Sequence, residues 1–220
     1  MMKELYESGK LGEIFNFRTS LYGSHGIPGD WRGKKEFGGG MLYDWGVHLI
    51  DQQLYLFAGL KVKSVYCTFE NITNDEVDDG FKLDIYFEEG LCARVEVGTS
   101  HFISLPRHYM TGSNGSAIVR GWGKDCEVVC CKNWEDKDVV PVVTAAGLTK
   151  TMAPRNKNTI TEYTIPNPAA NVHEFYMNFS DAIDGKAEQI VTHKELMRVM
   201  KVMEACFASV EAKAPVDFCE

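Results

Sequence analysis

The chain has 220 residues and a formal net charge of −8, with 45% hydrophobic and 25% charged residues. This composition is typical of a soluble globular protein, and the acidic balance disfavours a nucleic-acid-binding surface. Charges interrupt the apolar stretches before they reach the length of a membrane span, and the first residues lack the apolar core of a signal peptide. The seven cysteines form no C-x-x-C pair. We therefore expect a cytoplasmic protein with free thiols and no membrane contact.

The N-terminal third alternates between short regular elements and a long loop. Residues 2–9 are predicted to be the end of a helix. Apolar and polar side chains alternate over residues 13–22, which predicts a strand. Residues 24–40 form a loop rich in glycine and proline, which carries Trp31 and Arg32 and ends in three consecutive glycines.

The middle of the chain contains one helical pattern and several strand patterns. Residues 43–57 carry an apolar stripe with helical spacing. Strict alternation over residues 81–87 and 91–97, with a Glu-Gly turn between them, predicts an antiparallel hairpin. Further short strands are expected at residues 107–111, 116–120 and 127–131. Residues 132–168 show no clear period, so we expect long loops there with one or two short strands.

Two helices are predicted to close the chain. Asn171 is suited to cap the first, which ends before Gly185, and Thr192 with Glu195 forms a capping-box pattern that opens the second. Strands that cluster instead of alternating with helices favour an α+β fold over a parallel doubly wound sheet. The whole chain, residues 1–220, is predicted to be one domain, and it contains no G-x-G-x-x-G or P-loop motif.

The segment most informative about chemistry begins at Gly38 and ends at Asp51. On an α-helix, Asp44 and His48 are four residues apart and share one face. A carboxylate beside an imidazole raises its proton affinity, so the pair suits general acid and base catalysis. Taken alone, the spacing also fits an ordinary ion pair, or metal ligands completed by Asp51. A metal site would need further ligands, and no companion motif supplies them.

The combined pattern is more specific than its parts. A Trp-Arg dipeptide in a glycine-rich loop, followed by G-G-G-x-L-x-D-x-G-x-H-x-x-D, resembles the C-terminal domain of the Gfo/Idh/MocA oxidoreductases, which include glucose–fructose oxidoreductase and inositol dehydrogenase. The opening residues 3–14 and the last helix, which runs into Ala-Pro-Val at residues 214–216, are similar to the same family.

The resemblance implies both a fold and an activity. The fold is a two-layer, open and predominantly antiparallel sheet with helices on one face, like the C-terminal domain of dihydrodipicolinate reductase. The activity is oxidation or reduction of a secondary alcohol on a sugar or polyol with NAD or NADP. His48 would be the catalytic acid and base, with Asp44 as its orienting and substrate-binding partner, and Trp31 and Arg32 would contact the substrate.

The sequence also limits what this chain would do by itself. The Rossmann domain that binds the coenzyme in the family has no counterpart in these 220 residues, so we expect a substrate-binding and oligomerisation domain that is inactive alone. Tyr22 and Arg107 are weaker candidates for the pocket. Two other functions compete with the enzyme: a non-catalytic ligand-sensing or assembly protein of the same fold, and a metal-dependent isomerase or hydrolase.

The strand pattern also predicts a partner. One face of the expected sheet carries Tyr86, Cys92, Arg94 and Glu96, a mixture typical of protein interfaces. Three or four helices are too few to cover both faces. Members of the resembled family pair through such open sheet faces, so we expect a homodimer, or a tetramer built from two dimers.

Overall fold

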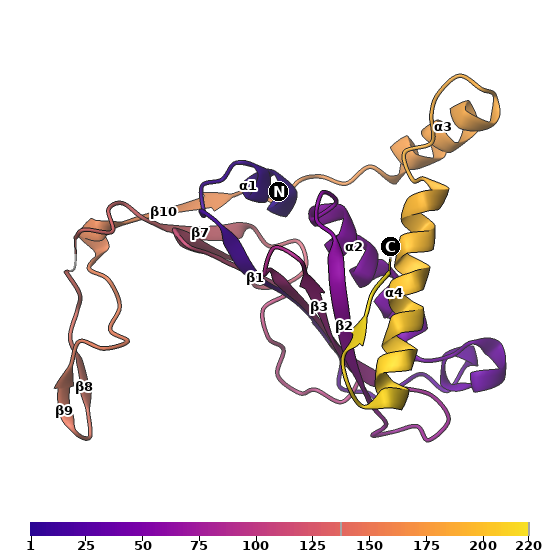
Figure 1. The fold of residues 1–220 in the computed structure, drawn as a ribbon, viewed down its shortest axis with the longest axis horizontal. Helices are drawn as coiled ribbons and strands as arrows, with labels where there is room; N and C mark the ends of the chain where they lie inside the picture. The colour runs from indigo at the N-terminus through magenta and orange to yellow at the C-terminus, as the bar shows by residue number, and fades with distance from the viewer. Residues whose placement is uncertain (137, 220) are drawn as a thin grey trace.

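The computed structural model of the protein describes residues 1–136 and 138–219. Within them, nine strands form one open sheet in the order β10-β7-β6-β5-β1-β4-β3-β2-β11, and the β8–β9 hairpin projects away from it (Figure 1). The bounds of the strands are β1 Ile14–Tyr22, β2 Val62–Glu70, β3 Gly80–Phe87, β4 Cys92–Gly98, β5 His108–Gly112, β6 Gly115–Val119, β7 Cys126–Cys131, β8 Val142–Thr144, β9 Gly147–Thr149, β10 Ile160–Ile165 and β11 Val216–Asp217.

The sheet is antiparallel except at one place. β1 and β4 run parallel, whereas the other neighbouring strands of the sheet pair antiparallel. Within the described part of the chain, four of the eight neighbouring pairs join strands that are consecutive in the chain, and the β3–β4 hairpin has the register expected from its alternating sequence. The predicted α+β fold with an open, predominantly antiparallel sheet is confirmed.

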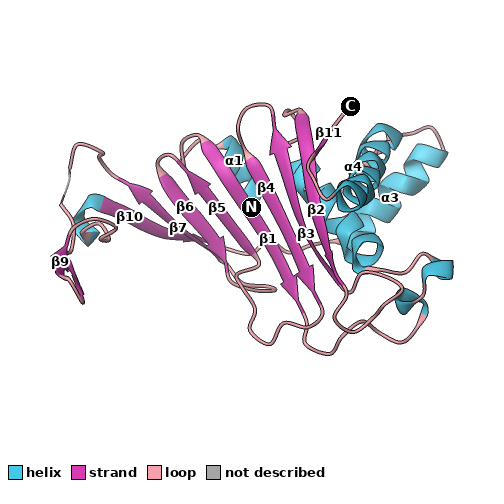
Figure 2. Ribbon diagram, turned by 60° about the horizontal axis from the view of Figure 1, so that its bottom comes forward, coloured by secondary structure: helices cyan, strands magenta, loops and turns pink. Residues whose placement is uncertain are grey.

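α2 (Val47–Leu56) and α4 (His193–Ala212) lie over one face of the sheet near β2, whereas α3 (Val172–Ile183) projects beyond the end of α4 (Figure 1 and Figure 2). Beneath them the sheet presents its apolar face, on which Leu83 and Val95 pair across β3 and β4 and are fully buried. No helix of the described residues is long and apolar enough to cross a membrane. α1 spans Met2–Glu7, and a π-helical turn, Leu42–Gly46, leads directly into α2.

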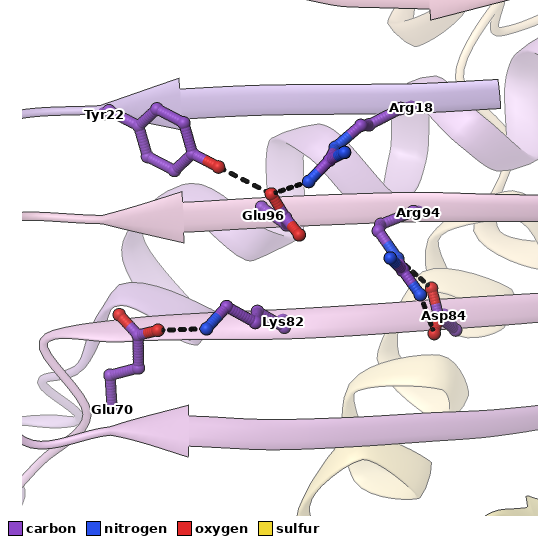
Figure 3. A network of polar contacts seen from close by, with 7 residues as sticks. All are labelled: Arg18, Tyr22, Glu70, Lys82, Asp84, Arg94 and Glu96. Atoms are coloured by element: carbon purple, nitrogen blue, oxygen red, sulfur yellow. Dashed lines mark hydrogen bonds and ion pairs between the residues drawn. The ribbon is translucent and has the colours of Figure 1, made fainter. Parts of the chain in front are cut away.

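The opposite face of the sheet carries ion pairs (Figure 3). Glu96 accepts hydrogen bonds from Arg18 Nη2 and Tyr22 Oη, each at 2.5 Å. Arg94 binds both carboxylate oxygens of Asp84, at 2.6 and 2.7 Å. Asp84 and Glu96 are both buried on this face, because the neighbouring arginines cover them and satisfy their charge.

The structure contains strands and an exposed apolar helix face that the sequence patterns did not predict. β2 was missed, although its apolar side chains alternate from Val65 onwards, because a register irregularity between Val62 and Ser64 breaks the pattern at its start. β10 lies within residues 132–168 and joins the main sheet beside β7. The predicted apolar stripe of α3 is present, but its side chains are exposed.

A buried serine closes the edge of the sheet. β11 pairs with β2 only at Val65 and Ser64, so the backbone N–H of Cys67 lies beyond its reach. The hydroxyl of Ser209 on α4 accepts that N–H at 3.0 Å and donates to the carbonyl of Ala214 at 2.7 Å. One side chain thereby satisfies two backbone groups and joins α4 to the sheet.

Replacing Ser209→Ala should lower the free energy of unfolding by about 1–3 kcal/mol, because it leaves a buried donor and an acceptor without partners. Urea unfolding followed by circular dichroism measures this loss. Ser180→Ala on the exposed α3 is the matched control and should change stability by less than about 0.5 kcal/mol. Equal effects of the two substitutions would contradict this role for Ser209.

Candidate functional site

The three glycines at residues 38–40 join the Trp31–Arg32 loop to the start of the helix. A Cβ atom on Gly39 would lie 2.3 Å from the carbonyl oxygen of Arg32, and Gly40 has a φ of +110°. Backbone N–H groups of Gly39 and Gly40 donate to the carbonyls of Lys34 and Arg32 at 3.0 and 2.8 Å. Only glycine fits both positions, because it has no Cβ atom and tolerates a positive φ. The two backbone hydrogen bonds then hold the loop close to the helix that follows.

Asp78 fixes the first turn of that helix from a distant loop. Its carboxylate accepts the N–H of Leu42 at 2.8 Å, and its carbonyl accepts the N–H of Met41 at 3.0 Å. A Cβ atom on Gly40 would lie 2.3 Å from Asp78 Oδ1, so the glycine makes room for the carboxylate. Burial raises the pKa of Asp78 from 3.8 to about 7, although the hydrogen bond from Leu42 opposes this rise.

A cleft of about 400 Å³ opens beside the start of the helix. It combines polar and charged groups with apolar and aromatic surface, which is the usual character of a small-molecule site. Four of its residues come from the segment that carries the motif, two come from the preceding loop, and one follows β4. The cleft is lined by Pro28, Arg32, Met41, Asp44, Trp45, His48 and Thr99.

The structure brings Asp44 and Arg32 together. Arg32 Nε donates to Asp44 Oδ2 at 3.0 Å, and its Nη1 donates to Asp30 Oδ2 at 2.8 Å. The hydrogen bond with Asp44 raises the pKa of Arg32. Trp31 does not line the cleft; its ring lies 4.6 Å from the guanidinium carbon of Arg32. The predicted Trp31–Arg32 unit therefore reaches the cleft through its arginine.

His48 also lines the cleft, but within the described residues no hydrogen bond joins it to Asp44. A π-helical turn, in which hydrogen bonds span five residues instead of four, covers Asp44 and ends at Gly46. The regular α-helical spacing that the sequence suggested for the pair therefore does not hold between Asp44 and His48. The ring of Trp45 lies 6.2 Å from the imidazole in an edge-to-face arrangement.

The third acid of the motif, Asp51, lies on α2 outside the set of cleft-lining residues. Burial and the nearby charge of Glu195 raise the pKa of Asp51, and His48 opposes this rise. Among residues 1–136 and 138–219, no group of three or more histidine, cysteine or acidic side chains could hold a metal ion.

Sequence reasoning missed several residues that shape the cleft. Asp30 caps the short turn that begins at Trp31, by accepting the N–H of Arg32, and an acid directly before Trp-Arg was a readable capping signal. Trp45 and Thr99 also line the cleft. Asp78 gave no comparable signal, because the helix that it caps begins 36 residues earlier in the chain.

Comparison with known proteins shows which family the chain resembles. Residues 1–118 match the family model described as the GFO/IDH/MocA C-terminal domain. An NAD-binding protein of Listeria innocua, known from its crystal structure, is 41% identical, with a TM-score of 0.91, over 98% of this chain and 62% of that one.

Two curated relatives are more distant. The scyllo-inositol 2-dehydrogenase (NADP+) of Bacillus subtilis is 27% identical, over 98% of this chain and 60% of its own length. An uncharacterized oxidoreductase of Schizosaccharomyces pombe is 25% identical, over 99% of this chain and 63% of its own length. The chain therefore spans about three fifths of the length of the relatives that it matches.

The raised pKa of Asp78 predicts how stability depends on pH. Between about pH 4 and pH 7 the folded state retains a proton that the unfolded chain has released, so the free energy of unfolding should fall as pH rises. Asp78→Asn keeps an oxygen that accepts the Leu42 N–H but cannot ionise. It should remove this part of the decline and be the more stable protein at pH 7, as measured by urea unfolding at several pH values.

The control for this experiment is Asp75→Asn, an exposed acid in the same loop, which should leave the pH dependence unchanged. Asp78→Ala, which removes the acceptor, should destabilise the protein by about 1–3 kcal/mol at pH 5. Stability curves of wild type and Asp78→Asn that run parallel from pH 4 to 7 would contradict the assignment.

Proposed function

Because the chain belongs to the GFO/IDH/MocA C-terminal domain family, which its residues 1–118 match, we propose that it forms the substrate-binding domain of a sugar or polyol oxidoreductase. The proposed reaction converts a secondary alcohol to a ketone, or the reverse, with NAD or NADP. The observation that carries this proposal is the cleft in which His48 is exposed beside Asp44 and Arg32. The B. subtilis relative, named as an inositol dehydrogenase, supports a polyol as the substrate class.

His48 is the group that we assign to proton transfer. Oxidation of a secondary alcohol requires that the hydroxyl proton be removed, and an exposed imidazole that lines the cleft is suited to accept it. Asp44 Oδ2 is already bound to Arg32, whereas within the described residues Oδ1 has no protein hydrogen bond. Asp44 is therefore assigned to binding a substrate hydroxyl, and Arg32 to holding Asp44 in place.

The residues of this chain do not fit the pyrophosphate of a dinucleotide. The glycine turn at residues 38–40 precedes a helix, but the N–H groups of Gly39, Gly40, Met41 and Leu42 already donate to acceptors within the protein. The carboxylate of Asp78 occupies the position that an anionic phosphate would take. We therefore place the coenzyme, which supplies the hydride acceptor, on a Rossmann domain outside these 220 residues.

The exposed helix α3 supports this placement. Its apolar side chains have no covering element among the described residues, and Phe175, Phe179 and Ile183 are 41%, 57% and 71% exposed. The alignments leave more than a third of each of the three relatives unmatched. A further domain of a full-length enzyme would give this apolar face a partner.

In a full-length enzyme that contains this chain, His48→Ala should reduce turnover by roughly 10²- to 10⁴-fold, the usual contribution of a positioned acid or base. Coenzyme affinity should stay nearly constant. The assay follows nicotinamide absorbance with a panel of polyols that includes scyllo-inositol. His173→Ala, an exposed histidine on α3, is the control. Turnover of the His48 variant within a factor of a few of wild type would contradict its role and favour a sensing or assembly function.

The polar face of the sheet is proposed as a homodimer interface. The helices leave this face open, and the buried Asp84 and Glu96 lie on it (Figure 3). Tyr86 and Cys92, which pair across β3 and β4, are partly exposed on the same face. An interface of this kind would complete the burial of charges whose hydrogen bonds are already made within each protomer.

Light scattering of the chain at micromolar concentration should give the mass of a dimer, or of a dimer of dimers. A double variant, Tyr86→Glu with Cys92→Glu, should dissociate it while the far-ultraviolet circular dichroism stays unchanged, because like charges would face each other across the two-fold axis. Glu88→Gln with Glu89→Gln, at the exposed β3–β4 turn, is the control and should leave the mass unchanged. A monomeric mass for the wild-type chain would contradict the proposal.

A further inference from the structure

Arg107 differs from several other arginines of the chain because it has no acidic partner among the described residues. It lies directly before β5, and its Nη1 is buried without a hydrogen-bond partner. Burial, with no opposing carboxylate, lowers its pKa. By contrast, four arginines each pair with at least one acid: Arg18 with Glu96, Arg32 with Asp30 and Asp44, Arg94 with Asp84, and Arg120 with Glu127.

An exposed tryptophan holds Arg107 in a defined orientation. The guanidinium carbon lies 3.5 Å from the ring centroid of Trp122, which is 64% exposed. Stacking of this kind orients the guanidinium plane without using its N–H donors. A planar fork of donors with no carboxylate of its own is the arrangement that recognises carboxylate and phosphate oxygens.

A chain of ring contacts connects Arg107 to the cleft. Trp122 lies 6.4 Å from Trp45, and Trp45 lies 6.2 Å from His48, as measured between ring centroids. Trp45 and His48 both line the cleft. A ligand that reaches from His48 across Trp45 would therefore meet Trp122 and Arg107 next.

Arg32, the arginine that lines the cleft, is not free to serve an anionic ligand. Arg32 binds the carboxylates of Asp30 and Asp44. The chain also carries a net charge of −8, so an anionic ligand needs a local cation to offset repulsion. Arg107, which reaches the cleft through the contact of Trp122 with Trp45, has no acidic partner among the described residues.

We propose that Arg107, stacked on Trp122, forms a subsite for an anionic oxygen group of the substrate, a carboxylate or a phosphate ester. Trp45 packs against the sugar or polyol carbons between this subsite and His48. The proposal rests on the proposed function, because it extends the same cleft, and it narrows the substrate class to acidic sugars or sugar phosphates. Carbohydrate rings pack their C–H faces on aromatic side chains, whereas their charged groups require a donor fork.

Nuclear magnetic resonance of the indole N–H groups tests the subsite on this chain. The four tryptophans give separate signals, assigned with single Trp→Phe variants. Glucuronate and glucose 6-phosphate should shift the signals of Trp45 and Trp122 at concentrations about tenfold lower than glucose, and should leave Trp134 unchanged. The acid that binds more tightly identifies the carboxylate or the phosphate as the preferred group.

Two substitutions make the result specific. Arg107→Gln should remove the advantage of the charged sugars, whereas Arg107→Lys, which keeps the charge without the fork, should keep part of it. Arg120→Gln removes an exposed arginine that is paired with Glu127, and it should leave the advantage intact.

The outcomes separate this inference from the proposed function. If glucose shifts Trp45 as strongly as glucuronate does, and Arg107→Gln changes neither titration, the anionic subsite is wrong while sugar binding in the cleft stands. If the charged sugars shift neither Trp45 nor Trp122, the subsite is also wrong. The proposed function is tested independently, by comparing the turnover of the His48→Ala enzyme with that of the wild type.

Discussion

The buried hydrogen bond from the N–H of Leu42 to the carboxylate of Asp78 determines where the helix of the cleft begins. It requires a glycine at residue 40, because any Cβ there would collide with the carboxylate. It also satisfies the helix N-terminus from within the protein, so no anionic ligand is needed there. The positions of Asp44 and His48 both follow from this one contact, since each lies within two turns of it.

The parallel pairing of β1 and β4 brings the rest of the cleft to the same place. Parallel strands end at the same edge of a sheet, so the two loops that follow them meet. Backbone hydrogen bonds join these loops, from Gly23 to Gly98 and from Gly26 to Thr99, at 2.8 and 2.9 Å. Thr99 therefore faces the loop that carries Arg32. The parallel β1–β4 pair thus brings together residues that line the cleft on two sides.

Local patterns predicted the elements whose signals are local. The β3–β4 hairpin and the capping box of Thr192 formed as expected, because neighbouring residues decide both. The π-helical turn was not predictable from spacing, so the sequence suggested an Asp44–His48 contact where the structure has Asp44 bound to Arg32. The amphipathic pattern of α3 predicted its apolar stripe but not the exposure of that stripe, because a pattern does not reveal which surface covers it.

The two arginines near the cleft illustrate how identical side chains acquire different roles. Arg32 lies between two carboxylates, so its charge serves to hold the loop and the helix together, and moving it would leave Asp44 uncompensated. Arg107 is held by the face of an aromatic ring, which orients a guanidinium without neutralising it. The guanidinium of Arg107 is therefore oriented while its positive charge and its N–H donors remain unpaired by any acid among the described residues. A site that recognises an anion needs both, whereas the ion pairs of Arg32 already use them.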